Sequence, residues 1–308
     1  MLKPAKLTSK NFLSNLDVSL EELSNIFDLA GQFKSKSLKV GFYNKVLGLI
    51  FDKSSTRTRV SFQVAMSRIG GTTIDLNPGT SQIGRGEPIK DTARVLSRYC
   101  DILAIRTFHH SDLEEYARWS SKPVVNALTD LEHPCQALAD YLTILEEFKS
   151  FDQVTLSYIG DGNNVANSLI LCGALLGINL RIATPKGFEP KPEILSKALQ
   201  IHKNPSKLLI TNDVYEAVKG SNVIYTDVWA SMGEEDESES KANQFKGFTV
   251  GTEVLSAANK DAIVLHCLPA YRGKEISNEV FESKASRIFQ QAENRLYTQQ
   301  ALLASILT

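Results

Sequence analysis

Cysteine is scarce in this sequence, and none of it falls into a metal-binding or disulfide pattern. The four cysteines, Cys100, Cys135, Cys172 and Cys267, lie far apart, with no C-x-x-C pair and no Cys/His set at zinc-ligand spacing. This spacing argues against a disulfide-stapled secreted scaffold and against a structural zinc module. We therefore expect a reduced, cytoplasmic protein with no metal ligands among its site residues.

Long apolar runs and an excess of charge of either sign are also missing. No uninterrupted apolar run approaches the ~20 residues that cross a bilayer, and the segment 1–6 leads into polar sequence without the apolar core of a signal peptide. The 34 Lys and Arg residues nearly balance the 35 Asp and Glu residues, so the formal net charge is -1. We therefore expect no nucleic-acid or membrane partner, and any anion binding has to be local.

The sequence does have a regular alternation of strand and helix patterns. Apolar residues make up 43% and charged residues 22%, as in soluble globular proteins, and 308 residues suffice for two hydrophobic cores. Polarity rises near 148–152, after which the alternation restarts. The pattern predicts an α/β protein of two domains, each with a central parallel sheet flanked by helices. We place the domains at 1–150 and 151–285, with 286–308 as a C-terminal helix that returns to the first domain.

The stretch 52–59, Asp-Lys-Ser-Ser-Thr-Arg-Thr-Arg, carries four hydroxyls, a lysine and two arginines. It follows the apolar run 46–51, which predicts a buried strand, and it precedes a helical pattern. Backbone N–H groups and the helix dipole favour an anion at such a place, and arginine binds phosphate oxygens in a bidentate way. The alternative is an ordinary Ser/Thr N-cap followed by solvated basic residues, but the whole run favours an anion site.

Further polar side chains follow other predicted strands of the first half. Arg106 ends the strand predicted at 101–105, and ligands bind along the carboxyl edge of open parallel sheets, so we expect Arg57, Arg59 and Arg106 to converge there. His133 and Gln136 begin a predicted helix one turn apart, and both can point to one ligand, although the plain alternative is a helix boundary. The Gly/Pro-rich stretch 77–88 predicts an irregular loop, either functional or a plain connection.

The second half begins in the manner of a nucleotide-binding fold but lacks one element of it. The strand predicted at 154–159 precedes the run 160–165, Gly-Asp-Gly-Asn-Asn-Val. Val165 stands where a dinucleotide fingerprint has its third glycine, which weakens a nucleotide interpretation considerably. Farther along, the acidic run 234–239 is typical of a solvated helix or lid face.

Three single residues of the second half are candidates for a site, two of them with a plain alternative. Asp227 follows a predicted strand and suits a substrate ammonium group. Cys267 also lies at a strand end, but a buried cysteine is usually a small hydrophobe, so its position alone gives it no catalytic role. Arg295, in the last predicted helix, is either a surface residue or a further anion ligand.

These motifs together resemble the aspartate/ornithine carbamoyltransferase family, and the match spans nearly the whole chain. In the first half, Ser-Thr-Arg-Thr-Arg at 55–59, His-Pro-Cys-Gln at 133–136 and Arg106 are similar to that family's carbamoyl phosphate site. The motifs that resemble the ornithine-using members are Gly-Asp-Gly-Asn-Asn at 160–164, Asp-Val-Trp-Ala-Ser-Met-Gly at 227–233 and His-Cys-Leu-Pro at 266–269.

The resemblance implies a role for each matching residue. The implied carbamoyl phosphate ligands are Ser55, Thr56, Arg57, Thr58, Gln82, Arg106, His133, Gln136, Cys267, Leu268 and Arg295. The implied ornithine ligands are Asn164, Asp227, Ser231 and Met232. The implied catalytic residues are Arg57, Arg106, His133, Asp227 and Cys267. Gln82 matches the position that reaches a neighbouring subunit's site, so the resemblance also implies a homotrimer, or a multiple of trimers, with shared active sites.

The implied reaction transfers the carbamoyl group of carbamoyl phosphate to the δ-amine of L-ornithine, giving L-citrulline and phosphate, in arginine biosynthesis. No cofactor is expected, because carbamoyl phosphate is already activated. One alternative is a carbamoyltransferase for another amine, such as putrescine, N-acetylornithine or aspartate. Another is a non-catalytic small-molecule-binding protein on the same fold. Val165 in place of the third glycine argues against a nucleotide-dependent dehydrogenase.

Overall fold

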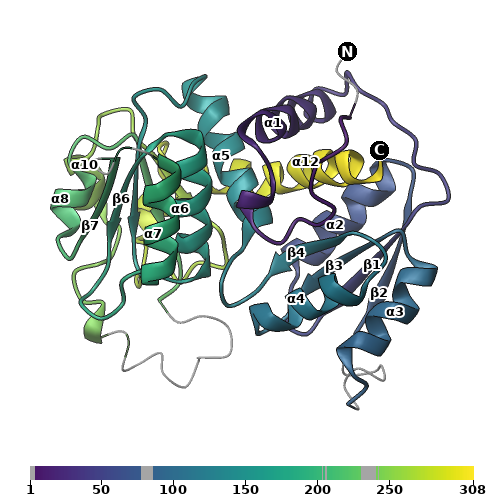
Figure 1. Cartoon of the computed structure of the whole chain (residues 1–308). Helices are drawn as coiled ribbons and strands as arrows, with labels where there is room; N and C mark the ends of the chain where they lie inside the picture. Colours follow the sequence, from purple (N-terminus) through teal and green to yellow (C-terminus); the bar gives the residue numbers. More distant parts are fainter. Residues whose placement is uncertain (1–3, 78–85, 203, 205–206, 230–240, 242) are drawn as a thin grey trace. The chain divides into compact units, whose positions relative to one another are not determined.

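The computed structural model describes residues 4–77, 86–202, 204, 207–229, 241 and 243–308. Strands and helices alternate along these residues, and the strands form two parallel sheets flanked by helices (Figure 1), which confirms the predicted fold class. The chain divides into two compact units, Met1–Ala139 with Glu293–Thr308 and Asp140–Ala292, called the first and the second unit below.

The borders of these units fall within two long helices, α5 (Pro134–Phe148) and α12 (Ile288–Leu307). The sequence instead placed its domain borders near 150, where the polarity rises, and at 285. Each of these helices contributes residues to both units, because it continues without a break through the point of division. The last 16 residues of the chain, Glu293–Thr308, count with the first unit, in line with a C-terminal helix that returns there.

The first unit holds a four-stranded parallel sheet in the order β2-β1-β3-β4. The register pairs Phe51 at the end of β1 with Arg106 at the end of β3, and Arg106 with Leu128 at the end of β4. The chain leaves β1 toward β2 on one side and β3 lies on the other, so β1 and β3 form the switch point at which such sheets bind ligands. The elements are α1 (Leu20–Lys34), β1 (Val46–Phe51), α2 (Arg57–Arg68), β2 (Thr72–Leu76), α3 (Ile89–Tyr99), β3 (Ile102–Arg106), α4 (His110–Trp119) and β4 (Val124–Leu128), with a short 3-10 helix at Asn15–Asp17.

Apolar side chains explain why these elements pack as they do. Leu103 and Ile105 of β3 share one buried cluster with Ala93 of α3 and with Leu113 and Tyr116 of α4, so these two helices cover one face of the sheet. Complete burial of one such large side chain stabilises the fold by ~1.5–3 kcal/mol. The carboxyl edge of the sheet is thereby held on a rigid support.

Helix α1 begins with a capping box, as the sequence pattern Ser19-Leu-Glu-Glu22 predicts. Ser19 accepts a hydrogen bond from the backbone N–H of Glu22 (3.1 Å) and the Glu22 carboxylate accepts one from the backbone N–H of Ser19 (2.7 Å). This capping box satisfies two N–H groups that the helix itself leaves without partners. Leu23 and Ile26, on the apolar stripe of α1, are fully buried.

The second unit holds a five-stranded parallel sheet in the order β7-β6-β5-β8-β9. The register pairs Ile159 at the end of β5 with Thr226 at the end of β8, and Thr226 with His266 at the end of β9. Its switch point is the β5/β8 pair. The elements are β5 (Thr155–Ile159), α6 (Asn164–Leu176), β6 (Asn179–Ala183), α7 (Pro192–His202), β7 (Leu208–Thr211), α8 (Val214–Val218), β8 (Val223–Thr226), α10 (Thr252–Ala257), β9 (Ile263–His266) and α11 (Asn278–Phe281).

Helices α6 and α7 contact each other along one face of this sheet (Figure 1). A second buried cluster joins Ile224 of β8 and Val264 of β9 to Val218 of α8 and Val254 of α10. Trp229, two residues beyond Asp227, belongs to the same cluster. The Trp229 ring stacks on Phe245 with centroids 5.4 Å apart, so the chain is anchored just after Asp227.

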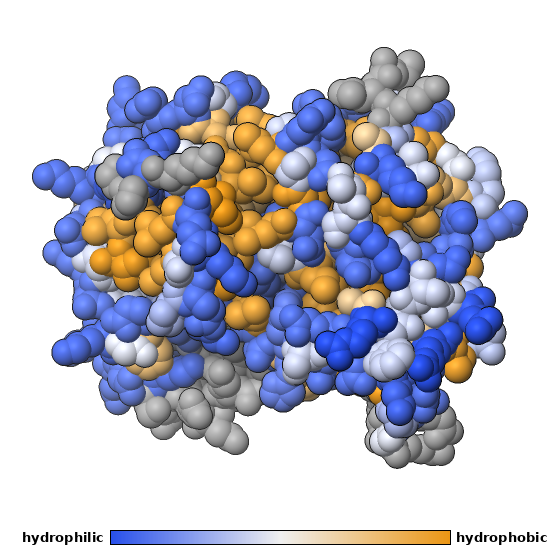
Figure 2. Space-filling model, viewed as in Figure 1, coloured by the Kyte–Doolittle hydropathy of each residue, from blue (hydrophilic) through white to orange (hydrophobic). Residues whose placement is uncertain are grey.

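Some of the predicted features lie outside the described residues, namely Gln82, Ser231, Met232 and the acidic run 234–239. Within the described ranges, no helix has both the length and the apolar character needed to span a bilayer. Figure 2 shows hydrophilic side chains over much of the visible face, with hydrophobic ones between them. This mixture is the ordinary surface of a globular protein, since apolar atoms always contribute a large part of the exposed area.

Candidate active site

Three predicted site residues of the first unit follow or end neighbouring strands. Arg57 begins α2 a short loop after β1, Arg106 is the last residue of β3, and His133 immediately precedes α5, after β4. Because β1, β3 and β4 are adjacent and parallel, their carboxyl ends lie along one edge of the sheet. The topology therefore brings these residues to one edge, as the sequence predicts.

The hydroxyl-rich stretch does not act as an ordinary helix cap. Thr56 occupies the N-cap position of α2 with φ -89° and ψ -59°, and among the described residues its side chain makes no capping hydrogen bond. Ser55 and Arg57 are half-buried and Thr58 is almost fully buried. The capping alternative therefore fails for Thr56, and the first turn of α2 remains an anion-site candidate.

Arg295 lies inside the first unit rather than on its surface. Only 3% of this residue is exposed, and its Nη2 donates a 2.6 Å hydrogen bond to the Thr58 hydroxyl. Thr58 belongs to the first turn of α2, so this bond fixes the α12 arginine beside the stretch 55–59. Of the two alternatives left open by the sequence, the buried guanidinium fits an anion ligand and excludes a surface residue.

His133 is 5% exposed, and its surroundings keep it neutral. Burial holds the pKa of this imidazole well below its usual range, and the nearby positive charges of Arg295 and Arg106 lower it further. A neutral imidazole can donate one hydrogen bond to a substrate oxygen without adding a third positive charge. Gln136, 1% exposed in the first turn of α5, adds a carboxamide.

Cys135 lies between these two residues in sequence but does not suit a nucleophile. Burial raises the pKa of its thiol to about 12, although Arg295 acts in the opposite direction. The Cys135 thiol donates to the backbone carbonyl of Asn126 at 3.3 Å. A thiol that stays protonated and bonded to the backbone is a structural part of the start of α5.

Arg59 has a partner of its own. Its guanidinium pairs with the carboxylate of Asp75 on β2 and lies over the ring of Phe51, 5.0 Å from the ring centroid. The expectation that Arg57, Arg59 and Arg106 converge on one ligand is therefore wrong for Arg59. The cause is the order of the sheet: β2 lies beside β1 on the side away from β3, and it offers a carboxylate to this helix turn.

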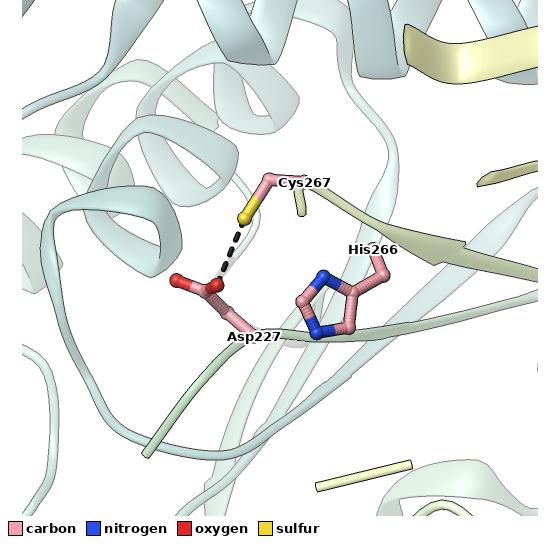
Figure 3. A group of neighbouring side chains, drawn as sticks. All are labelled: Asp227, His266 and Cys267. Carbon is pink, nitrogen blue, oxygen red and sulfur yellow. Dashed lines mark hydrogen bonds between the residues drawn. The ribbon is translucent and has the colours of Figure 1, made fainter. Parts of the chain in front are cut away.

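The second unit brings together Asp227 after β8 and Cys267 after β9 (Figure 3). The Cys267 thiol donates a 2.8 Å hydrogen bond to Oδ1 of Asp227, which is 5% exposed, whereas Cys267 is half-buried. Asn164, the predicted ornithine ligand of α6, is the first residue of that helix and is half-buried. An acidic group beside an accessible thiol has the polarity expected of a site for an amine.

His266 completes a group whose ligand atoms lie close enough for a metal ion. One ligand atom from each of Asp227, His266 and Cys267 lies within 4.8 Å of the others. However, Nδ1 of His266 accepts the backbone N–H of Leu268 at 2.9 Å, and Nε2 faces Oε1 of Glu275 at 3.1 Å. Both ring nitrogens are therefore engaged, and a metal ion would have to displace one of these bonds to reach the imidazole.

Two family models match the chain. The carbamoyl-P binding domain of aspartate/ornithine carbamoyltransferases matches residues 10–146, and the Asp/Orn binding domain of the same family matches residues 152–306. The chain belongs to the aspartate/ornithine carbamoyltransferase family. The resemblance that the motifs of both halves suggested is thereby confirmed.

Individual relatives agree with this assignment. The chain is 70% identical over 308 residues to the ornithine carbamoyltransferase of Prochlorococcus marinus strain MIT 9312, with 100% of both chains covered. The solved ornithine carbamoyltransferase of Pyrococcus furiosus superposes with a TM-score of 0.92 at 43% identity, covering 99% of this chain and 98% of that one. The anabolic ornithine carbamoyltransferase of Campylobacter jejuni gives 0.91 at 43% identity, covering 97% and 99%.

Two residues that support Asp227 and the neighbouring end of β9 were missed as functional candidates from the sequence. Asn163 donates from Nδ2 to Oδ2 of Asp227 at 2.8 Å. Gln291 accepts the backbone N–H of His266 at 2.9 Å and donates to the buried carboxylate of Asp140 at 2.7 Å. The motif at 160–164 could have drawn attention to Asn163, but nothing local in the sequence marks Gln291.

The loop after β9 is shaped by the engaged imidazole. Leu268 has φ +61°, a left-handed conformation that residues other than glycine rarely adopt, and its N–H is bonded to His266. Glu275, 1% exposed, also accepts the backbone N–H of Tyr271 at 2.6 Å. The implied contacts of Cys267 and Leu268 with carbamoyl phosphate stay predictions, as do those of Gln82, Ser231 and Met232.

Proposed function

We propose that this chain catalyses carbamoyl transfer from carbamoyl phosphate to the δ-amine of L-ornithine, giving L-citrulline and phosphate, in arginine biosynthesis. The observation that carries the choice of acceptor is the 70% identity, over the full length of both chains, to a relative named ornithine carbamoyltransferase. An anabolic ornithine carbamoyltransferase with a TM-score of 0.91 supports the biosynthetic direction.

We assign the donor side to the first unit, because its buried positive charges suit carbamoyl phosphate. Arg57 and Arg106, with Ser55, Thr56 and Thr58, bind the phosphate oxygens. Neutral His133 donates to the carbonyl oxygen, on which negative charge builds as the amine attacks. Preorganised donors aimed at developing charge commonly provide ~2.7–4 kcal/mol each in the transition state. Gln136 and Arg295 complete this donor pocket.

The acceptor side belongs to the second unit, where the site is negative. Asp227 binds and orients the substrate's amino groups, with Asn164, Ser231 and Met232 as further ornithine ligands. The nucleophile has to be a neutral amine, although an alkylamine of the lysine type has a pKa of ~10.4. As the new C–N bond forms, the C–O bond to phosphate breaks, and the departing phosphate takes the proton that the amine loses. Cys267, which donates to Asp227 at 2.8 Å, stands beside the carboxylate that orients this amine.

We also propose a homotrimer, or a multiple of trimers, in the cytoplasm. Large apolar side chains are exposed on the first unit, with Ile74 on β2 45% exposed and Tyr99 on α3 69% exposed. Such side chains are suited to a subunit interface. All four cysteines carry free thiols, which fits a reducing compartment.

A steady-state assay with carbamoyl phosphate and a panel of acceptors tests the proposed reaction. We expect citrulline from ornithine at a kcat/KM at least ~100-fold above that for putrescine, N-acetylornithine or aspartate. Preference for another amine would overturn the choice of acceptor. Absence of turnover with every acceptor, in a folded protein that still binds carbamoyl phosphate, would favour the non-catalytic alternative.

A further inference from the structure

The two ends of the Asn163 carboxamide have different partners. Its Oδ1 accepts hydrogen bonds from the backbone N–H groups of Val165 (2.9 Å) and Ala166 (3.1 Å), which makes it the N-cap of α6. Only the oxygen of a carboxamide can accept, so these two bonds fix the orientation of the side chain. Nδ2 must then face away from the helix.

The end that faces away from the helix meets the predicted ornithine ligand. Nδ2 of Asn163 lies 2.8 Å from Oδ2 of Asp227, and the other carboxylate oxygen, Oδ1, accepts the Cys267 thiol at 2.8 Å. The two oxygens of Asp227 therefore have different partners. The carboxamide of Asn163 holds one oxygen, while the other lies beside the accessible thiol (Figure 3 shows Asp227 and Cys267).

The sheet order explains why these residues meet. Strands β5 and β8 are neighbours, with Ile159 paired to Thr226, so the chain leaves both strands at the same height. Asn163 comes four residues after the end of β5 and Asp227 directly after the end of β8. The α6 cap thus lies at the switch point of the second sheet, where α/β folds bind ligands.

A second cap in the same unit shows what is special about Asn163. Oδ1 of Asp213 caps α8 with the same pair of bonds, from the N–H groups of Tyr215 (2.8 Å) and Glu216 (3.2 Å). Asn, Asp, Ser and Thr all serve as caps, and they differ by only a few tenths of a kcal/mol. Capping alone therefore does not require asparagine at 163, whereas a cap that also donates to a carboxylate does.

We propose that Asn163 is a positioning residue of the acceptor site: by donating to Oδ2 of Asp227 it fixes the carboxylate in the orientation that receives the substrate's amino group. This inference rests on the proposed function, since it assigns a role within the ornithine site. Asn163 acts through Asp227 and, in this proposal, does not touch the substrate.

Two substitutions separate the cap from the positioning role. Asn163→Ser keeps a capping oxygen but has no group that reaches Asp227 as a donor. Asn163→Asp keeps the cap and the shape, but it places a carboxylate oxygen where the donor was, 2.8 Å from Asp227. Asp213→Ser is the matched control, because it makes the same kind of cap change on α8, which carries no predicted site residue.

We expect Asp213→Ser to unfold within about 3 °C of the wild-type protein, because it keeps a capping residue. The two Asn163 variants keep the cap but lose the donor to the Asp227 carboxylate, so their midpoints should fall by several degrees, and their kinetics are measured well below those midpoints. Asn163→Ser should lower kcat/KM for ornithine about tenfold, less than the loss of Asp227 itself, with KM for carbamoyl phosphate nearly unchanged, because a misplaced carboxylate keeps part of its contact with the amine. At pH 8, Asn163→Asp should lower it further, and Asp213→Ser should leave it unchanged. Wild-type kcat/KM for ornithine in both Asn163 variants would overturn the inference.

A thiol probe tests the same inference without turnover. Cys267 is the half-buried cysteine and the other three are buried, so the rate of iodoacetamide labelling, located by peptide mass analysis, reports on Cys267. Labelling should be faster in Asn163→Ser, because a released Asp227 turns away from the thiol. It should be slower by about threefold or more in Asn163→Asp, because a second carboxylate opposes thiolate formation. Unchanged rates in both variants would contradict the positioning role. An inactive wild-type protein would instead refute the proposed function, while the labelling rates would still judge the Asn163–Asp227 contact.

Discussion

The two units have the same kind of parallel sheet, but their candidate site residues have opposite charge. Each has a parallel sheet whose switch point carries its site residues, β1 with β3 in the first unit and β5 with β8 in the second. In the first unit the buried groups are two guanidiniums and an imidazole kept neutral, Arg106, Arg295 and His133. In the second, a carboxylate lies between a carboxamide and a thiol. The fold therefore supplies a place for a ligand, and the side chains decide its charge.

The manner of support also differs between the two units. Arg295 donates to the Thr58 hydroxyl, and burial together with the surrounding positive charges keeps His133 neutral. Asp227 is held by the Asn163 carboxamide, and the neighbouring strand end by Gln291 and Glu275 through His266. The buried carboxylate of Asp227 is thus supported by neutral donors, as a buried negative charge requires, whereas the first unit gathers positive groups around a neutral imidazole.

The largest expected effect comes from removing a donor-side arginine. Arg57→Gly should lower turnover by ~10³-fold or more, because the phosphate loses a charged donor at the start of α2. Arg59→Gly is the control two residues away, since Arg59 pairs with Asp75, and it should keep turnover within about threefold of the wild-type value. Equal losses in the two variants, measured as citrulline formation, would contradict the division between site and scaffold within α2.

The next effect belongs to the acceptor side. Asp227→Ala should reduce kcat/KM for ornithine by ~10–100-fold, because hydrogen bonds to charged groups contribute ~1.5–3 kcal/mol. The loss should appear mainly with varied ornithine, while KM for carbamoyl phosphate changes little. A variant with normal ornithine kinetics but a raised KM for carbamoyl phosphate would reverse our assignment of the two units.

Replacing Gln291 tests the buried hydrogen bonds that support the acceptor side, rather than a residue that contacts the substrate. Gln291→Leu leaves the Asp140 carboxylate and the His266 N–H without this partner inside the second unit, so we expect a loss of ~1–3 kcal/mol in stability. Gln290→Leu is the matched control, because its bond to Glu146 is only partly buried, and it should cost under ~0.5 kcal/mol. Thermal unfolding curves of both variants measure the difference, and equal midpoints would show that the buried network contributes little.

The smallest expected effect is a change in the free energy of unfolding with pH that originates in His133 of the first unit. The pKa of His133 is lowered by folding, so below its ordinary value of ~6.5 the unfolded chain binds more protons than the folded protein. Stability should therefore fall as the pH drops below ~6.5. Between pH 7.5 and pH 5.5, the wild-type protein should lose about 1 kcal/mol more free energy of unfolding than His133→Gln, because the variant lacks this imidazole. The same pH dependence in wild type and variant would mean that His133 is not the buried neutral group.

Much of this fold is predictable from the sequence, because its signals are local. The capping box at Ser19, the buried run at 46–51 and the strand at 179–183 each follow from periodicity and flanking residues, and the structure has all of them. The placement of Arg106 and His133 at the carboxyl edge of the first sheet follows in the same way, since each lies next to a predicted strand end or helix start. A residue at the end of a parallel strand lies at the ligand edge whatever the strand order is.

What the sequence alone does not reveal depends on the order of the strands. Asn163 and Asp227 are 64 residues apart and meet only because β5 lies beside β8. Arg59 was expected at the anion site, but β2 lies next to β1 and its Asp75 takes the guanidinium. Gln291 reaches His266 from a helix whose place is set by packing over the whole unit. Such contacts are specified by tertiary topology, which no local pattern encodes.

We assign the carbamoyl donor to the first unit and the amine acceptor to the second. Calorimetric titration of carbamoyl phosphate into the wild-type protein, Arg57→Gly and Asp227→Ala tests this division most directly. We predict that Arg57→Gly abolishes measurable binding and that Asp227→Ala leaves the Kd within about threefold of the wild-type value, because Asp227 makes no contact with the donor in this account. Loss of carbamoyl phosphate binding in Asp227→Ala, or its retention in Arg57→Gly, would contradict the account.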